Sequence, residues 1–418
     1  MNLLSTCMNA RGLPLLVCIG GIAVSLAFDV LIYPRIAGQL TANLDPDRIG
    51  ELASNIYQSG AFVYGSDSVR TVTFDRGPVY PYLVASVYCL TGTDRAIGVH
   101  VMQAVLHGLC GVFLFSIGQR VFDRRIGLVA QSIHAMHPIL VWYTARIWIE
   151  TTHTMLVTAT VLALTSLAYQ PNPRKILIAG IALGVTVLTK SVLLLLPFPL
   201  VVYALLRRNR SFLLATGSAT LVATLIVVPW TLRNFSLSGH FVPVHTSLGL
   251  NLYQGEAISR NWLSAPFSTA DLWSTGHSMS DSVLAPLNVR PESPEGDSAL
   301  IRSVFSDWTS HPELLLQHVT LNALTFWYLA ETPIKSFVVI TLQLPLLILA
   351  GWRLTFVWRR YPASHVAIIT FFYFWVLHGF IVGWVRYSVP ILPLLILLSV
   401  AATGSSGPGG SSDGLFRK

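Results

Sequence analysis

The sequence predicts an all-α polytopic membrane protein in which about ten transmembrane helices form one bundle. Of its 418 residues, 53% are hydrophobic and 11% are charged, whereas a soluble domain carries about 25% charged residues. The apolar residues also occur in runs long enough to cross a bilayer, which takes roughly 20 residues for ~30 Å of hydrocarbon. These two observations exclude a soluble domain with a single anchor.

Ten apolar segments are expected to span the membrane. They lie at about 12–33, 97–119, 126–147, 149–169, 175–190, 192–206, 211–229, 335–357, 361–383 and 387–403. No small-residue cleavage site follows the first segment, so we expect it to be retained as a span. The fifth and sixth segments are short and almost contiguous, and the count of ten depends most on them.

The basic residues predict which side of the membrane is cytoplasmic. The net charge is +8, but the basic residues are spread over short gaps between apolar segments, which argues against a nucleic-acid-binding face. With the N-terminus inside, the strongly basic gaps all fall on the cytoplasmic side, as the positive-inside rule requires. These gaps and the two ends contain Arg11, Arg120, Arg124, Arg125, Arg174, Lys175, Arg207, Arg208, Arg210, Arg353, Arg359, Arg360, Arg417 and Lys418. We therefore expect an inner (plasma) membrane protein with both termini cytoplasmic.

This topology leaves two long loops outside, at about 34–96 and about 230–334, and nearly all acidic residues lie in them. We expect the chemistry to take place there, on the periplasmic side. Residues 1–403 are predicted to form one transmembrane domain, and the Gly- and Ser-rich segment 404–418 a disordered cytoplasmic tail. The four cysteines show no metal-ligand spacing, so no disulfide framework is expected.

The first outer loop is predicted to contain a helix that lies on the membrane surface. It opens with Asp45-Pro46-Asp47, and apolar residues then recur at helical spacing until Gly60. Asp45 is a natural N-cap, with Pro46 at the first helical position. Capping is therefore a sufficient local explanation for Asp45.

A second motif follows this helix and introduces a family. The motif reads Phe74-Asp75-Arg76-Gly77-Pro78-Val79-Tyr80-Pro81 and leads into an apolar stretch. An acidic residue, a surface helix and this turn, in that order, resemble the GT-C-fold glycosyltransferases related to dolichyl-phosphate-mannose protein mannosyltransferases and bacterial aminoarabinose transferases. The chain has Gly77 and Val79 where proline and glycine are usual in that family.

Further matches follow in the family's order and extend the resemblance over most of residues 1–400. They are His137-Pro138, Trp148-Ile149-Glu150-Thr151, Leu188-Thr189-Lys190, Pro229-Trp230-Thr231-Leu232-Arg233-Asn234, Gly239-His240-Phe241-Val242-Pro243-Val244, Gly249-Leu250-Asn251-Leu252-Tyr253-Gln254-Gly255 and Arg386-Tyr387-Ser388-Val389-Pro390. The resemblance implies a GT-C-like bundle whose two outer loops carry juxtamembrane helices. It also implies transfer of a hexosyl or pentosyl group from a polyprenyl-phosphate donor to a glycan, lipid or protein acceptor.

The resemblance assigns roles to particular residues. The acidic residue of the first outer loop is the expected general base, which is Asp45, with Asp47 as the second candidate. The candidates for binding the donor phosphate are Lys190, Arg386, Arg233 and Arg76. The alternative for such cations is that they reach from the ends of spans to lipid headgroups. The candidates for other substrate contacts are Glu150, Tyr80, Tyr253 and Tyr387.

A divalent metal is a further expectation, and it is a weaker one. Asp45 and Glu150 are the candidate ligands, because carboxylate oxygens suit Mg²⁺, Mn²⁺ or Ca²⁺.

Three histidines near the third and fourth spans are expected to pack inside the bundle and not to bind a metal; they are His134, His137 and His153. Four tryptophans near predicted span ends are expected at the membrane interface; they are Trp142, Trp148, Trp230 and Trp384.

Two other function classes stay open. A lipid-linked sugar transporter or flippase would bind near the membrane midplane and often shows repeat symmetry, whereas here the ionisable residues cluster outside and no internal repeat is evident. A catalytically inactive relative that serves as an assembly subunit is compatible with the altered turn at Gly77 and Val79. Glu256, where relatives often have Asn, is compatible with it too.

Overall fold

The computed structural model describes residues 12–40, 45, 47–65 and 70–403. The predicted disordered tail, 404–418, lies outside this range. Within it, seven helical stretches are long and apolar enough to cross a membrane. They are Gly12–Ile36, Ala96–Val121, Glu150–Tyr169, Arg210–Ser238, Pro333–Trp352, Pro362–Phe380 and Val385–Thr403. The protein is an integral membrane protein, as the composition predicts.

The long helices of the bundle are α2 (Gly12–Ala27), α6 (Ala96–Val121), α9 (Glu150–Tyr169), α12 (Arg210–Ser238), α17 (Pro333–Trp352), α19 (His365–Phe380) and α21 (Leu392–Thr403). Shorter elements complete it: η1 (Phe28–Ile32), α3 (Tyr33–Leu40), α5 (Val79–Thr91), α7 (Arg124–Met136), α8 (Pro138–Thr144), α10 (Pro173–Thr189), η2 (Ser191–Leu195), α11 (Pro197–Leu206), α18 (Leu354–Arg360), η4 (Pro362–Ser364), α20 (Val385–Ser388) and η5 (Val389–Ile391). Each predicted span coincides with one helix or with two or three consecutive helical elements, and the count of ten crossings stays a prediction.

The predicted span at 126–147 contains two helices, because it is broken between α7 and α8. Pro138 has no backbone N–H to continue the ladder of α7, and its ring disfavours a helical conformation of His137. His137 is accordingly extended, with φ −68° and ψ 118°. The break allows the segment after α8 to turn back toward the outer end of α9.

The helix ends follow local sequence signals. The side chains of Asp123, Asn172 and Asn209 accept hydrogen bonds from backbone N–H groups in the first turns of α7, α10 and α12, as N-caps do. Gly60 and Gly239 follow α4 and α12 with φ of 70° and 71°, the left-handed conformation that glycine adopts without strain.

Small residues set the closest helix contacts. A Cβ added at Gly118 of α6 would lie 2.5 Å from Cα of Gly127 in α7, and one at Gly180 of α10 would lie 2.7 Å from the carbonyl oxygen of Ala219 in α12. Glycine therefore lets these backbones approach, as in other membrane bundles. The segment that ends in α21 is buried on all sides, whereas α2 and α17 lie at the periphery.

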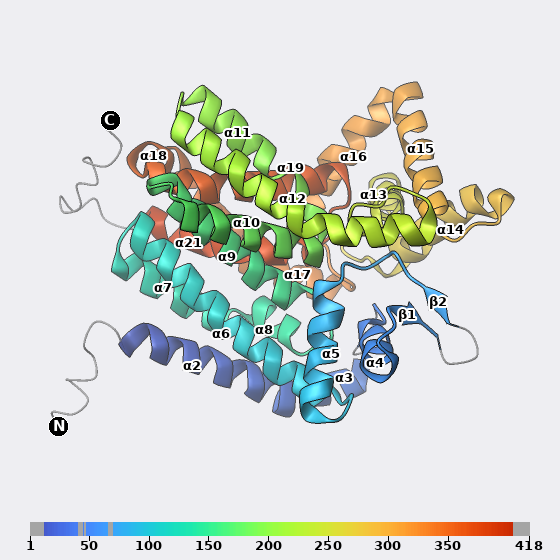
Figure 1. The fold of residues 1–418 in the computed structure, drawn as a ribbon, viewed down its shortest axis with the longest axis horizontal. Coiled ribbons are helices and arrows are strands. Elements are labelled where there is room, and N and C mark those ends of the chain that lie inside the picture. Colours follow the sequence, from blue (N-terminus) through green and yellow to red (C-terminus); the bar gives the residue numbers. More distant parts are fainter. Residues whose placement is uncertain (1–11, 41–44, 46, 66–69, 404–418) are drawn as a thin grey trace.

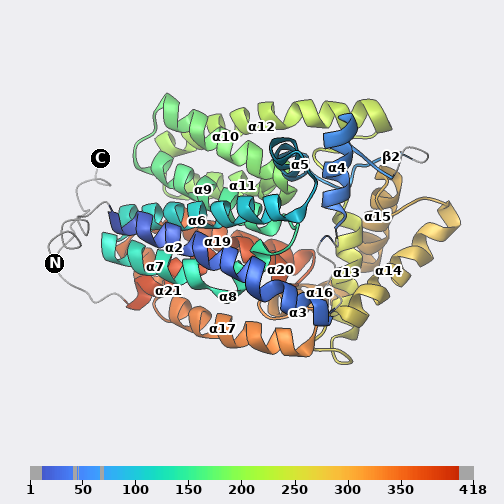
Figure 2. The ribbon, with the colours of Figure 1, turned by 90° about the horizontal axis from the view of Figure 1, so that it is seen from below.

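The outer elements gather at one end of the bundle. They are α4 (Ile49–Ser59), β1 (Val63–Tyr64), β2 (Thr71–Val72), α13 (Leu248–Asn261), α14 (Ala270–Leu284), η3 (Ala285–Leu287), α15 (Pro294–Ser310) and α16 (Pro312–Thr325). The strands β1 and β2 pair antiparallel. The described chain begins in α2 and ends in α21 at the opposite end (Figure 1, Figure 2).

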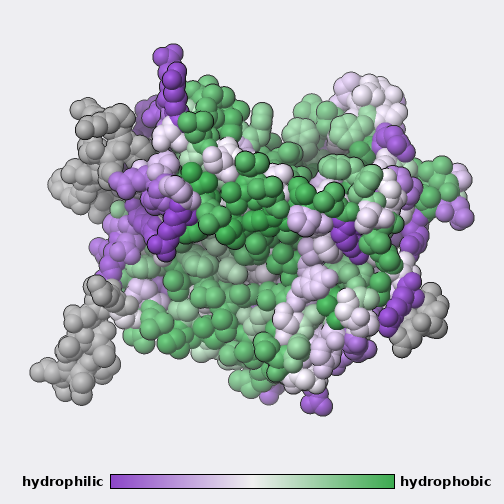
Figure 3. Space-filling view, viewed as in Figure 1, coloured by the Kyte–Doolittle hydropathy of each residue, from purple (hydrophilic) through white to green (hydrophobic). Residues whose placement is uncertain are grey.

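The distribution of hydrophobic residues over the surface agrees with a bundle whose central part lies in the membrane. In Figure 3 hydrophobic residues cover the central part of the visible face, and hydrophilic residues gather toward its two ends. The two predicted outer loops therefore share one polar end, where they enclose the candidate site.

Candidate active site

The end of the bundle at which the two predicted outer loops meet contains a cavity of about 350 Å³, called the inner cavity below. It lies where the start of α4, the end of α10, the start of α13 and α20 meet. The residues that line it and matter for the chemistry are Asp47, Arg76, Lys190, His245, Arg386 and Tyr387. Four of these six, Asp47, Arg76, Lys190 and Arg386, were predicted as catalytic or phosphate-binding residues, and Tyr387 as a substrate contact.

Six charged residues form an ionic cluster beside this cavity. The Arg386 guanidinium donates through Nε to Glu150 Oε1 at 2.6 Å and through Nη1 to Asp47 Oδ1 at 3.3 Å, and its Nη2 also contacts Asp47. Lys190 Nζ lies 3.7 Å from Glu150 Oε1, and Arg76 Nη2 lies 3.9 Å from Asp47 Oδ1. Arg76 Nη1 also lies 3.5 Å from Asp75 Oδ2. Three cations therefore face three carboxylates.

Distant parts of the chain supply this cluster. Lys190 follows the last residue of α10, Arg386 lies in α20, and Glu150 is the first residue of α9, where a helix N-terminus favours negative charge. The bond between Arg386 and Asp47 joins residues 339 apart in sequence. The long helices therefore bring together residues whose proximity is not visible in any local motif.

Trp148 lies between two guanidinium groups. The Cζ atom of Arg146 is 4.1 Å from the centre of the Trp148 ring, and that of Arg386 is 4.4 Å away. Trp148 and Trp384 are both buried in the protein. The expectation that these two form part of an interfacial belt is wrong, because here the indole of Trp148 packs against cations, an attractive contact for an aromatic face.

The two candidate bases occupy different surroundings. The Asp45 carboxylate accepts backbone N–H bonds from Ile49 and Gly50, both at 2.7 Å, and so caps α4. A Cβ at Gly50 would lie 2.9 Å from Asp45 Oδ2, so glycine permits this approach. Asp47 instead lines the inner cavity.

These surroundings act on the two pKa values in opposite directions. Burial raises the pKa of Asp45, and the backbone N–H bonds offset only part of that effect. Burial would also raise the pKa of Asp47, but the charges of Arg386 and Arg76 hold it well below its usual range. Asp47 is therefore ionised at neutral pH and is a weak base for as long as it is paired.

The structure explains the altered turn between the first outer loop and α5. A Cβ at Gly77 would lie 2.2 Å from the carbonyl oxygen of Leu188 and 2.8 Å from that of Thr189. Only glycine fits there without movement of the backbone. The turn that carries Arg76 thus packs directly on the end of α10, beside Lys190.

Several predicted substrate residues do not line the inner cavity. The Tyr80 hydroxyl donates to Gln103 Oε1 at 3.1 Å inside the bundle, and the Tyr253 hydroxyl donates to Ser303 at 2.8 Å. The Arg233 guanidinium packs 4.6 Å from the Trp230 ring and donates to the Thr73 carbonyl. Their roles in substrate binding stay predictions, whereas the contacts observed are structural.

Tyr387 does reach the site. Its hydroxyl donates to Asn251 Oδ1 at 3.0 Å, and its ring centre lies 4.4 Å from Lys190 Nζ. The ring therefore holds the Lys190 ammonium against the cavity, while α13 holds the ring through Asn251.

His245 also lines the inner cavity, and the sequence did not single it out. Its Nε2 atom lies 3.2 Å from Ser191 Oγ and accepts from the Ser191 backbone N–H at 3.4 Å, while Nδ1 lies 2.9 Å from Ser247 Oγ. Burial, followed by the charges of Arg76 and Lys190, lowers the pKa of His245 to about 4. The imidazole is neutral at pH 7. The one sequence feature that pointed to His245 was its position between two stretches that resemble the family, 239–244 and 249–255.

The described residues contain no group of three or more His, Cys, Asp or Glu side chains that could hold a metal ion. The two candidate metal ligands already have partners: Asp45 accepts backbone N–H groups, and Glu150 Oε1 is bound by Arg386 and Lys190. The His134 and His107 rings stack with centres 4.5 Å apart inside the bundle. His134 is thus packed in the interior, as expected.

Comparison with known proteins agrees with the motifs. A family model described as dolichyl-phosphate-mannose-protein mannosyltransferase matches residues 75–232. Two structures of the oligosaccharyltransferase of Archaeoglobus fulgidus are similar to this chain. AglB in complex with an inhibitory peptide and a dolichol-phosphate has a TM-score of 0.56 at 14% identity, over 93% of this chain and 50% of that one. The apo form has a TM-score of 0.57 at 14% identity, over 94% and 51%.

The fold is of the GT-C type. The resemblance inferred from the motifs is thereby confirmed. ArnT from Cupriavidus metallidurans in the apo state is also similar, with a TM-score of 0.49 at 16% identity over 85% of this chain and 54% of that one. The chain spans about half the length of the archaeal structures it matches. No curated protein sequence matches it.

Proposed function

We propose that the protein is a membrane glycosyltransferase that moves a hexosyl or pentosyl group from a polyprenyl-phosphate donor to an acceptor on the periplasmic side. The ionic cluster carries this proposal. Three cations, Lys190, Arg386 and Arg76, line the inner cavity at the polar end of a GT-C-type bundle, and each is paired with a carboxylate. A lipid phosphate that enters this cavity would compete with the carboxylates for these cations.

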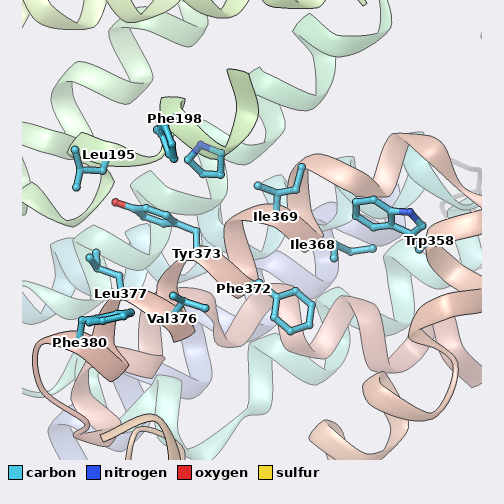
Figure 4. Close-up of a pocket in the computed structure, with 11 residues that line it drawn as sticks. Leu195, Phe198, Trp358, Ile368, Ile369, Phe372, Tyr373, Val376, Leu377 and Phe380 are labelled. Carbon is cyan, nitrogen blue, oxygen red and sulfur yellow. The ribbon is translucent and has the colours of Figure 1, made fainter. Parts of the chain in front are cut away.

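An apolar groove next to the cluster supports a lipid-linked donor. Its volume is about 540 Å³, and Figure 4 shows its lining side chains projecting from α19, from the segment of η2 and α11, and, at Trp358, from α18. The Tyr373 hydroxyl donates to the carbonyl of Val192, two residues after Lys190. The phosphate of the donor would lie at Lys190 while its prenyl chain follows the groove along α19.

The chemistry then needs a base and stabilisation of the leaving group. An acceptor hydroxyl oxygen bonds to the anomeric carbon, the bond from that carbon to the phosphate oxygen breaks, and the polyprenyl phosphate leaves with the electron pair. Lys190 and Arg386 stabilise the charge on the departing phosphate. The hydroxyl proton passes to a carboxylate.

Asp47 is the carboxylate that the geometry favours as this base, and Asp45 is the alternative. A donor phosphate competes with Asp47 for Arg386, so binding of the donor releases the Asp47 carboxylate and raises its pKa toward the usual range. Asp45, whose oxygens accept N–H bonds from α4, holds the helix next to Asp47. The enzyme would thus gain its base when the donor is in place.

The same cations make a metal unnecessary in this scheme. Lys190 and Arg386 occupy the positions beside Glu150 that Mg²⁺, Mn²⁺ or Ca²⁺ would otherwise take. We expect turnover to persist after chelation with EDTA. Loss of turnover on chelation, with recovery on adding one of these ions, would contradict this part of the proposal.

Release of polyprenyl phosphate from purified protein in nanodiscs tests the function. With polyprenyl-phosphate sugars supplied, wild type should release polyprenyl phosphate and Lys190→Ala should bind the donor more weakly. Sugar that crosses vesicle membranes without bond cleavage would instead identify a transporter. Donor binding without turnover for any acceptor would identify an inactive assembly subunit.

A further inference from the structure

A second cavity of about 740 Å³, called the outer cavity below, adjoins the inner one. It lies between the β1–β2 hairpin on one side and, on the other, the end of α12 and the turn at 290–295 before α15. Asp47, Asp75, Arg76 and Glu292 line both cavities. The two spaces therefore meet at the proposed base.

This arrangement suits a displacement reaction. The attacking hydroxyl and the leaving phosphate must lie on opposite sides of the anomeric carbon, so the donor and the acceptor need separate spaces that meet at the base. Asp47 is 18% exposed and Arg76 28% exposed, so a ligand in the outer cavity can reach the Asp47 carboxylate. The inner cavity is then free for the donor.

The turn at 290–295 presents two charged side chains from a fixed backbone. The Thr246 hydroxyl donates to the Glu292 carbonyl at 2.5 Å, and a Cβ at Gly296 would lie 2.0 Å from the Arg290 carbonyl oxygen, so the turn packs tightly against the start of α15. The side chains of Arg290 and Glu292 are exposed and make no ion pair with any described residue. Both are available to a ligand.

The charges around the outer cavity are of mixed sign. Arg48, Arg290, Glu292 and Glu295 all line it, and Arg48 is ion-paired with Glu51. The Arg48 guanidinium lies 4.6 Å from the centre of the Tyr64 ring, whose hydroxyl is buried without a hydrogen-bond partner in the described chain. Such a surface offers donors, acceptors and an aromatic edge. It has neither the single sign that a phosphorylated headgroup needs nor the apolar surface that an acyl chain needs.

We propose that the outer cavity binds the acceptor and that the acceptor is a neutral, hydroxyl-rich glycan. This rests on the proposed function, because it assumes a donor in the inner cavity. Hydroxyl groups both donate and accept, so they pair with the arginines and with the carboxylates alike. The volume falls in the roughly 300–1,000 Å³ range of ligand pockets and accommodates a short stretch of sugar chain.

Binding to the full-length protein in nanodiscs tests the proposal. The probes are neutral oligosaccharides from α-mannan, β-glucan and arabinan, a Ser- and Thr-rich peptide, and vesicles that contain lipopolysaccharide. We expect an oligosaccharide to bind, and Arg290→Ala and Glu292→Ala each to weaken its binding about tenfold, or ~1.4 kcal/mol. The matched controls Arg302→Ala and Glu313→Ala, at exposed positions outside the outer cavity, should not.

Polyprenyl phosphate binding separates this proposal from the proposed function. It should be the same in wild type and in Arg290→Ala, because Arg290 lines the outer cavity and not the inner one. Lys190→Ala should weaken it, and a normal affinity there would count against the donor site and not against the outer cavity. The glycan proposal is overturned if no oligosaccharide binds, if the peptide or the vesicles bind in a way that depends on Arg290 and Glu292, or if the control variants lose affinity equally.

Discussion

The inner and the outer cavity share Asp47 but differ in how their charges are compensated. In the inner cavity the three cations are paired with carboxylates, and Arg386 contacts both Asp47 and Glu150. In the outer cavity Arg290, and Glu292 where the two cavities meet, are exposed and make no ion pair within the described chain. The first arrangement suits one fixed anion, such as a phosphate. The second suits a ligand whose many weak polar contacts form at the moment of binding.

The largest expected effect concerns the residue at which the cavities meet. Asp47→Asn should lower kcat by about 10²–10⁴, the usual contribution of a general base, with a smaller change in donor affinity. The control is Asp45→Asn, because asparagine still accepts N–H bonds as a helix cap. Release of polyprenyl phosphate measures both. Normal turnover in Asp47→Asn together with loss in Asp45→Asn would move the base to Asp45.

Substitution of one arginine in each cavity compares how much the two cavities contribute to the stability of the fold. Arg386→Gln leaves Asp47 and Glu150 without their main partner, and breaking a buried ion pair costs about 3–5 kcal/mol. Arg290→Gln removes an exposed charge, and such changes usually stay within about 0.5 kcal/mol. Thermal unfolding in nanodiscs measures the difference. Equal shifts in Tm would show that the ionic cluster is not a structural element.

Gly77→Ala tests the packing behind the inner cavity. The added methyl group overlaps the Leu188 carbonyl oxygen, and overpacking typically costs about 1–3 kcal/mol. Because the turn carries Arg76, donor affinity should fall while oligosaccharide binding at the outer cavity changes less. Gly92→Ala, a glycine with open space around it but a φ of 66°, controls for a general effect of losing glycine. An unchanged donor affinity in Gly77→Ala would show that the turn can shift without affecting Arg76.

The smallest expected effect is a dependence of stability on pH. The pKa of His245 is about 4 in the folded protein, against an ordinary value of 6.5. The unfolded chain therefore takes up the proton first, so His245 contributes stability above pH 6.5 that is lost as the pH falls toward 4. His245→Gln should flatten Tm between pH 6.5 and 4, and His240→Gln, at an exposed site near the outer cavity, should not.

Hydropathy and charge predicted much of the fold. The long apolar helices such as α6 and α12 lie where the sequence places them, and the acidic loops share one end of the bundle. These features depend on contiguous residues, for which the sequence is sufficient. The break at Pro138 was missed because an apolar run looks continuous on both sides of a proline.

The sequence predicted which types of residue are found at the site better than it predicted which residues they contact. The motifs contain Lys190, Arg386 and Glu150, but only the structure shows that the two cations contact Glu150. Tyr80 and Tyr253 instead donate to Gln103 and Ser303, because the direction of a side chain depends on how its helix is rotated in the bundle. A motif records which residue is present and not which way it faces.

The sequence by itself therefore determined the membrane class, the all-α architecture, the placement of the acidic loops together and the presence of a family motif at Arg76. Only the tertiary structure decided that Asp47 and not Asp45 lines the cavity, that His245 lies there, and that two cavities share Asp47. The physical reason is the separation along the chain of the residues that each interaction joins. Hydropathy and capping act over a few neighbouring residues, whereas an ion pair between residues 339 apart forms only after the helices have packed.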